Sequence, residues 1–125
     1  MIDTIQTEIE KGKKKGVARV KATGEVFTPM DLCMRMVREI PEEKLRDPSA
    51  KFIDHSCGDG NFLVALCEVL TKEYDHPLEH VLDEMIYGVD LMPDNIVEAK
   101  RRLGVPEDHP HFVCADALEY DYLFE

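Results

Sequence analysis

The stretch from Lys51 to Leu70 constrains the fold most, because a short strand candidate, a glycine turn and a helix follow one another in it without a linker. The segment KFID at 51–54 is the strand candidate, and SCGDGN at 56–61 forms the turn. Apolar residues then recur at helical spacing, at Phe62, Leu63, Leu66, Val69 and Leu70. A strand that turns directly into a helix is the building unit of α/β domains.

Two more strand candidates follow, each separated from the one before it by a helix. They are MIYGVD at 85–90 and HFVC at 111–114. Helices are predicted over 77–84 and from Pro93 to Leu103, where Gly104 ends the second one. Strands joined through helices form a parallel sheet with right-handed crossovers. The sequence therefore predicts an α/β, Rossmann-like domain with a parallel sheet core.

Upstream of this domain, Thr28 and Pro29 precede a further helical stretch that Pro41 ends. Its predicted apolar face consists of Leu32, Met36, Val37 and Ile40. Residues 2–11 also have helical spacing, and they run into the charged, glycine-flanked stretch KGKKKG at 11–16, which is typical of an exposed linker. We therefore predict an N-terminal helical and basic arm at 1–21 and one globular domain at 22–125.

The net charge of −11 is unevenly distributed between these two parts. Residues 1–21 contain six basic and three acidic side chains, a balance of +3, which leaves −14 for residues 22–125. A protein that binds DNA needs a basic face to displace counterions from the phosphates. We therefore expect DNA binding only through the arm, a missing segment or a partner chain.

The apolar pattern excludes a membrane protein, because no apolar run approaches the 18 or so residues that a span needs. The N-terminus is acidic and polar, unlike a signal peptide. We therefore expect a soluble, cytoplasmic protein without a membrane partner.

Cysteines and histidines give no sign of a metal site. Cys33, Cys57, Cys67 and Cys114 form no CxxC pair, so they are interpreted as reduced thiols. The segment HPLEH at 76–80 fits the zinc-peptidase pattern HxxEH, but its proline favours the first turn of a helix and places the first histidine outside it. His109 and His111 flank a proline and are predicted to lie at the surface. No metal ligand is assigned.

An aspartate lies at or just after the end of each predicted strand: Asp54, Asp90 and Asp116. Ligands of open α/β sheets bind at the carboxyl ends of the strands, and carboxylates there can accept hydrogen bonds from an ammonium group, ribose hydroxyls or an adenine amine. Aspartate also favours turns for structural reasons, so one alone carries little information. The pattern does not complete a dinucleotide-binding motif, because Leu63 replaces its third glycine.

The segment DHSCGDGNFL at 54–63 is similar to the cofactor loop D-P-[SA]-C-G-x-G-x-F-L of N6-adenine DNA methyltransferases of restriction-modification type. His55 departs from this pattern, which has proline there. Upstream, GEVFTP at 24–29 resembles the family segment G-x-x-[FY]-T-P. Downstream, YGVD at 87–90, the helix ending AKRRL at 99–103 and ADAL at 115–118 resemble its next blocks in order. The resemblance covers residues 24–118.

This resemblance implies a methyltransferase fold of Rossmann type and S-adenosylmethionine as the cofactor. Carried over by position, Thr28 and Asp54 would contact the methionine part, and the backbone from Gly58 to Gly60 would pass beneath the cofactor. Asp90 would accept from the ribose hydroxyls and Asp116 from the adenine amine. The complete set of implied cofactor-binding residues is Phe27, Thr28, Pro29, Asp54, Ser56, Cys57, Gly58, Gly60, Asp90, Leu91, Asp116 and Ala117.

The family's base-acting motif N-P-P-[YF] is absent from the 125 residues, so no catalytic residue is assigned. In the family this motif lies on the strand after the third block and holds the flipped adenine. We therefore expect a cofactor-binding part of an adenine-specific DNA methyltransferase, truncated after the third strand. The alternatives are a cofactor-binding module that sequesters S-adenosylmethionine without transferring its methyl group, and an acidic domain that binds a protein partner.

Three strands are few for a parallel sheet, and the third needs further strands or a partner. A protein partner or a homo-oligomer is therefore expected at the open sheet edge. The family resemblance further implies the cytoplasm of a bacterial or phage-infected cell.

Overall fold

A computed structural model describes residues 28–124 of the chain. The predicted arm at 1–21 and the candidate site residue Phe27 lie outside the described residues. In chain order the elements are α2 (Met30–Arg38), α3 (Glu42–Arg46), β1 (Phe52–Asp54), α4 (Asn61–Lys72), α5 (Leu78–His80), the π-helix η1 (Val81–Met85), β2 (Ile86–Asp90), α6 (Pro93–Leu103) and β3 (Phe112–Cys114).

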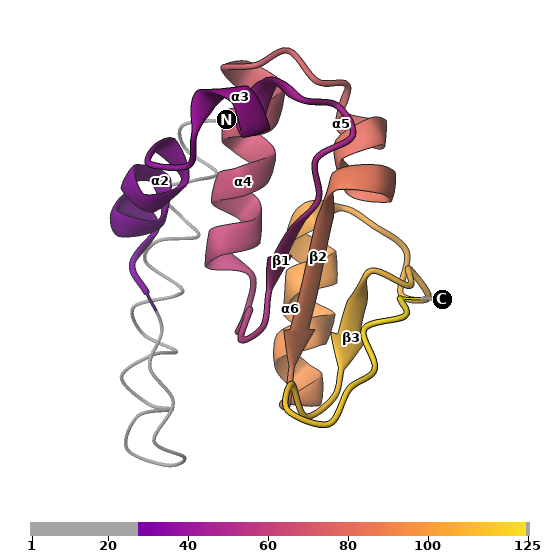
Figure 1. The fold of residues 1–125 in the computed structure, drawn as a ribbon. Helices are drawn as coiled ribbons and strands as arrows, with labels where there is room; N and C mark the ends of the chain where they lie inside the picture. The colour runs from indigo at the N-terminus through magenta and orange to yellow at the C-terminus, as the bar shows by residue number, and fades with distance from the viewer. Residues whose placement is uncertain (1–27, 125) are drawn as a thin grey trace.

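The three strands form one sheet, which is parallel as predicted, and their order is β1-β2-β3 (Figure 1). In this register Asp54 lies opposite Gly88, and Asp90 lies opposite Cys114. The strands run in one direction, so their carboxyl ends lie at one edge of the sheet. Asp54 and Asp90 are the last residues of β1 and β2, and Asp116 follows β3, so all three predicted aspartates lie at that edge.

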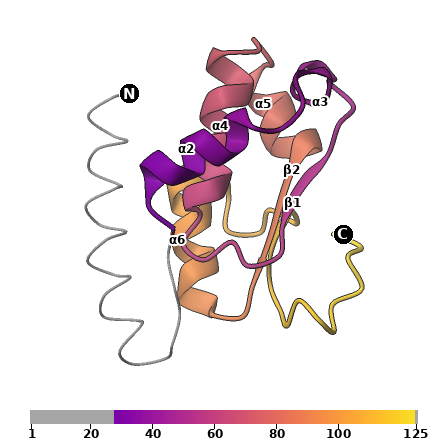
Figure 2. The same ribbon diagram turned by 60° about the vertical axis from the view of Figure 1, so that its left-hand side comes forward.

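Different parts of the chain cover the two faces of the sheet. Helices α4 and α6 lie on one face, and the C-terminal segment at 115–124 runs over the other, as the two views in Figures 1 and 2 agree. Helix α2 packs against α4 on the side away from the sheet. The described part is therefore an α/β domain of Rossmann type with helices on a single face of its sheet.

Helix α6 shows how local chemistry sets the bounds of an element. Pro93 occupies its first turn, where the missing N–H costs no hydrogen bond, and Gly104 ends it in the left-handed conformation at φ 72°. The amide of Val105 then donates to the carbonyl of Lys100 across the end of the helix. Both bounds agree with the prediction.

A continuous apolar core lies between the helices and the sheet. Its fully buried side chains include Val37 of α2, Leu66 of α4, Ile86 of β2 and Phe112 of β3. Gly88 lies at the centre, where a Cβ atom would come within 2.7 Å of a Leu63 methyl group. The strand can approach α4 this closely only because it has no side chain at that position.

The predicted apolar face of α2 was partly wrong. The helix buries Met30, Cys33 and Val37, whereas Leu32 and Met36 are exposed. The sequence contains two overlapping apolar stripes at helical spacing, and α4 packs against only one of them.

The predicted surface positions of His109 and His111 were also wrong. The His111 ring is stacked on Tyr87 at a centroid distance of 4.1 Å, and its Nδ1 lies 3.1 Å from the Ile86 carbonyl oxygen. His109 packs edge-on against His111, and its Nε2 lies 3.0 Å from Asp83. Both rings therefore serve to pack the segment that enters β3, and burial lowers the pKa of His111.

Within residues 28–124 no helix is long and apolar enough to cross a membrane.

Candidate cofactor site at the carboxyl edge of the sheet

The glycine turn between β1 and α4 is held by backbone hydrogen bonds to the neighbouring strand and within itself. The Cys57 amide donates to the Val89 carbonyl of β2 at 3.0 Å, and the Gly60 amide donates back to the Cys57 carbonyl at 2.9 Å. Gly58 and Gly60 have φ angles of 55° and 99°, which glycine adopts at little cost. The turn therefore presents bare backbone at the edge of the sheet.

Gly60 also has little room for a side chain. A Cβ atom there would lie 3.0 Å from the Cβ of Ala99, so the backbone of the turn is in contact with the Ala99 side chain of α6. Beside this contact, the Arg102 guanidinium donates to the Asp59 carbonyl at 2.9 Å and lies 3.4 Å from the Asp59 carboxylate. Both side chains are almost fully buried. A buried ion pair thus anchors the underside of the turn to α6.

Asp90 fixes the shape of two loops at once. Its Oδ1 accepts from the Gly58 amide at 3.1 Å, and its Oδ2 accepts from the Met92 amide at 3.0 Å and the Asn95 side-chain amide at 2.9 Å. A carboxylate oxygen has two lone pairs, so these bonds fill Oδ2 and leave one acceptor position on Oδ1. Asp90 therefore has a structural role that the sequence analysis did not assign to it.

Asp54 lies on the other side of the turn and is half-buried. Its Oδ1 accepts from the Ser56 amide at 3.0 Å. Burial raises the pKa of Asp54, the Ser56 hydrogen bond and His55 lower it, and the negative charge of Asp90 raises it further, so that the net shift is upward. Two carboxyl groups therefore lie at this edge, one on each side of the glycine turn.

The third aspartate, Asp116, is exposed in the turn that follows β3. Its Oδ1 accepts from the Leu118 amide at 2.9 Å, and the preceding Ala115 amide donates to the Asp90 carbonyl at 3.0 Å. Leu91 and Leu118 are strongly exposed beside it. The third strand thus contributes a carboxylate and apolar surface at the far end of the same edge.

The start of α2 closes the other end of the site. The side-chain amide of Asn61 donates to the Thr28 carbonyl at 2.8 Å, which ties the segment before α2 to the first residue of α4. Beside this contact, a cavity of about 340 Å³ lies between α2 and the end of β1. Its lining residues are Thr28, Cys33, Met36, Ile53, Asp54, His55, Ser56 and Phe62.

The cysteines near the site are structural thiols. Burial raises the pKa of Cys33 to about 11 and raises the pKa of Cys57 still further. Thiols in such surroundings stay protonated and pack as small apolar groups, so neither is a nucleophile at neutral pH.

The zinc-peptidase pattern has a structural explanation. The Nε2 atoms of His76 and His80 each lie 2.7 Å from a backbone carbonyl oxygen, that of Leu45 and that of Pro48. Among the described residues no group of three potential ligands could hold a metal ion.

The described candidate residues therefore lie in the loops at one edge of the sheet or at the start of α2. Sequence reasoning missed three side chains that support them, Asn61, Asn95 and Arg102. All three are polar residues on the apolar side of a helix, and that position was the signal that could have identified them.

The family model for N-6 DNA methylase matches residues 14–103, which is more than two thirds of the chain. The chain belongs to the N-6 DNA methylase family. The match includes Thr28, Asp54, the glycine turn and Asp90, and it ends before Asp116. Among curated proteins, none matches the chain.

Membership of the N-6 DNA methylase family identifies the described part as a methyltransferase-like domain and agrees with its parallel sheet. The family generally depends on S-adenosylmethionine.

Proposed function

We propose that this chain binds S-adenosylmethionine at the carboxyl edge of its sheet and forms the cofactor-binding part of an adenine-specific DNA methyltransferase. The observation that carries the proposal is the arrangement of Asp54, Asp90 and Asp116 around a turn of bare glycine backbone. When bound, S-adenosylmethionine supplies an electrophilic methyl group on a sulfonium centre.

The charges at this edge fit such a ligand. The methionine part of the cofactor carries an ammonium group, and Asp54 is a half-buried carboxylate whose pKa is raised chiefly by its burial. A ligand ammonium would compensate that burial with a charge-assisted hydrogen bond. Thr28 and Ser56 line the same cavity and offer polar groups beside it.

The remaining groups fit the adenosine part. Asp90 keeps one acceptor position, which suits one ribose hydroxyl, and the exposed Asp116 suits the adenine amine. Leu91 and Ala117 provide apolar surface for the base. Gly58, with a φ angle of 55°, allows the bare backbone of the turn to come close to the ligand.

The cofactor-binding module without transferase activity remains the second candidate, because the 125 residues contain no Asn-Pro-Pro sequence. A completed enzyme would need that motif and a basic DNA-binding surface from another segment or chain. Strands β1 and β3 each have a free outer edge within the described sheet, and a cavity of about 530 Å³ runs beside β1 between α3 and Phe62. These edges support the proposal that further strands or a partner complete the sheet.

Calorimetric titration of the chain with S-adenosylhomocysteine tests the proposal. We expect one saturable site per chain and competition by S-adenosylmethionine. NAD serves as a control ligand of similar polarity and is expected to give no heat beyond dilution. Absence of saturable binding by both sulfur-containing ligands would overturn the proposed function.

A further inference from the structure

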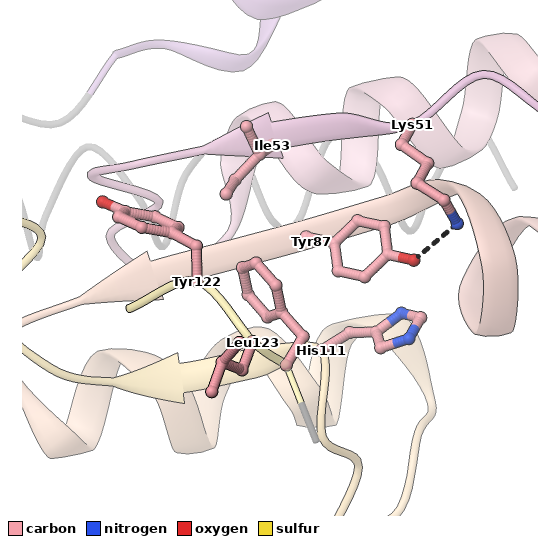
Figure 3. A pocket seen from close by; sticks show the side chains of 7 residues that line it. Lys51, Ile53, Tyr87, His111, Tyr122 and Leu123 are labelled. Carbon is pink, nitrogen blue, oxygen red and sulfur yellow. Dashed lines mark hydrogen bonds between the residues drawn. The ribbon is translucent and has the colours of Figure 1, made fainter. Parts of the chain in front are cut away.

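The C-terminal segment reaches back to the glycine turn through one side chain. Tyr122 lies over the open face of the sheet, and its hydroxyl points toward the end of β1 (Figure 3). That hydroxyl lies 3.0 Å from Nδ1 of His55 and 2.5 Å from the Ala117 carbonyl oxygen. A single hydroxyl thus contacts the loop after β1 and the loop after β3, which lie on opposite sides of β2.

The donor and acceptor roles in this contact follow from the chemistry. The Ala117 carbonyl can only accept, so the Tyr122 hydroxyl donates its single hydrogen there. The Tyr122 oxygen must then accept from His55, which therefore has a hydrogen on Nδ1. The two rings also meet edge to face at a centroid distance of 5.3 Å. This geometry fixes both the tautomer and the orientation of the His55 ring.

The backbone of the C-terminal segment adopts an uncommon conformation at two residues, and this conformation places the Tyr122 side chain. Tyr122 and Phe124 have φ angles of 59° and 49°, in the left-handed region that residues with side chains seldom occupy. Two other contacts hold the segment in place: the Phe124 amide donates to the Tyr120 hydroxyl at 2.9 Å, and the Phe124 ring packs on Tyr87. The strained conformation persists because the surrounding contacts over-determine it.

We propose that Tyr122 is a positioning residue for the cofactor site, holding the His55 side of the glycine turn and the Ala117 side of the third loop at a fixed separation. This inference rests on the proposed function. Asp54 and Ser56 flank His55, and Asp116 precedes Ala117, so the groups assigned to the two ends of the ligand are joined through this hydroxyl. These two hydrogen bonds hold both sides of the site in position before the ligand binds.

The test compares the affinity of four chains for S-adenosylhomocysteine: the wild type, Tyr122→Phe, His55→Ala and the double variant. Tyr122→Phe retains the ring and removes both hydrogen bonds, and we expect a loss of about three- to tenfold in affinity. His55→Ala should cost a similar factor. The affinity of the double variant should fall no more than that of the weaker single variant, because both substitutions remove the same hydrogen bond between His55 and Tyr122.

Tyr74→Phe is the matched control. Tyr74 follows the last turn of α4, at the opposite end of that helix from the glycine turn, and its ring packs under the Arg46 guanidinium. Removal of its hydroxyl should change the affinity less than twofold. A second readout is the ¹⁵N spectrum of the His55 side chain, which should show a hydrogen on Nδ1 in the wild type and a changed tautomer balance in Tyr122→Phe.

The outcomes separate the two proposals. Binding by the wild type with an unchanged affinity in Tyr122→Phe, or with losses that simply add in the double variant, would overturn the positioning role alone. Absence of binding by the wild type would overturn the proposed function and this inference with it.

Discussion

Asp54 is the residue in which stability and the proposed function conflict most directly. Its carboxylate is half-buried, it accepts one backbone hydrogen bond, and the charge of Asp90 opposes its ionisation. A group with a raised pKa in the folded state stabilises the protein at low pH, and that contribution is lost as the pH rises through the raised value. At neutral pH the ionised Asp54 side chain therefore lowers the free energy of unfolding of the chain without ligand.

Replacement of Asp54 by asparagine should separate these two effects. The asparagine side chain keeps an oxygen for the Ser56 amide and removes the buried charge, so the melting temperature at pH 7 should equal or exceed that of the wild type. Any gain should vanish at a pH below both pKa values. The affinity for S-adenosylhomocysteine should fall by about 1.5–3 kcal/mol, because a hydrogen bond to a charged group is lost. Thermal denaturation and calorimetry measure the two quantities.

Asp47→Asn is the control for this variant. Asp47 accepts from the Ser49 amide two residues ahead, as Asp54 does from Ser56, but it lies before β1, at the amino end of the strand. Its substitution should leave the affinity unchanged. An Asp54→Asn chain that binds as tightly as the wild type would contradict the assignment of Asp54 to the ligand ammonium.

Asp90 gives a second prediction at the same scale. Asp90→Ala removes acceptors from the Gly58 amide, the Met92 amide and the Asn95 side chain. We expect the affinity for S-adenosylhomocysteine to fall by about 1–3 kcal/mol and the melting temperature to fall as well, because the three donors are left without their partner. An unchanged affinity in a chain that is still folded would show that the ribose assignment is wrong.

At the scale of the secondary-structure elements, the junction between the glycine turn and α6 is sensitive to added volume. Gly60→Ala places a left-handed alanine 3.0 Å from the Cβ of Ala99, and we expect a loss of about 2–4 kcal/mol in the free energy of unfolding. Gly104→Ala has the same conformational penalty in open space and should cost only about 1 kcal/mol. Urea denaturation compares the two, and equal losses would mean that the close packing at Ala99 is unimportant.

Elements with local signals at both ends could be predicted from the sequence, and those without them could not. Helix α6 has a proline at its start and a glycine at its end, and its bounds were predicted to the residue. Helix α3 has five residues, too few to show a periodicity, and it was not predicted. The burial of His111 depends on stacking with Tyr87 from another strand, which no local pattern reveals.

The same distinction applies to the candidate site. Asp54, Asp90 and Asp116 could be placed at one edge because each follows a strand, and parallel strands end together. Their hydrogen-bond partners could not be predicted in the same way. Asn61 contacts a carbonyl 33 positions away, Arg102 one 43 positions away, and His55 a hydroxyl 67 positions away. Such pairings depend on tertiary packing, and a single sequence carries no direct record of them.

The molecule as a whole is acidic, with a net charge of −11 and a balance of −14 over residues 22–125. A polyanion approaching another polyanion gains nothing from counterion release, so we expect this domain to need added basic groups to hold a duplex. Whole-chain electrostatics thus agree with a part that serves the cofactor rather than the nucleic acid.

We therefore expect no methyl transfer to DNA by the 125-residue chain alone. Incubation with radiolabelled S-adenosylmethionine and unmethylated DNA should give no incorporation above background, because the residues that would orient an adenine amine are absent from the sequence. Addition of a separate segment carrying Asn-Pro-Pro and a basic recognition domain should restore incorporation. Transfer by the chain alone would contradict the prediction, and no transfer with the added segment would favour the cofactor-binding module.

The hydrogen bonds between β2 and the glycine turn also have a consequence for biosynthesis. The Gly58 amide is bonded to Asp90, 32 positions later in the chain, and the Cys57 amide to Val89. Translation proceeds from the N-terminus, so a nascent chain that ends with α4 contains the whole turn but neither Val89 nor Asp90, the two residues of β2 that bond to it. Contacts this distant in sequence form late. The ligand-facing edge therefore forms only after β2 has left the ribosome, and nascent chains that end before Asp90 should lack it.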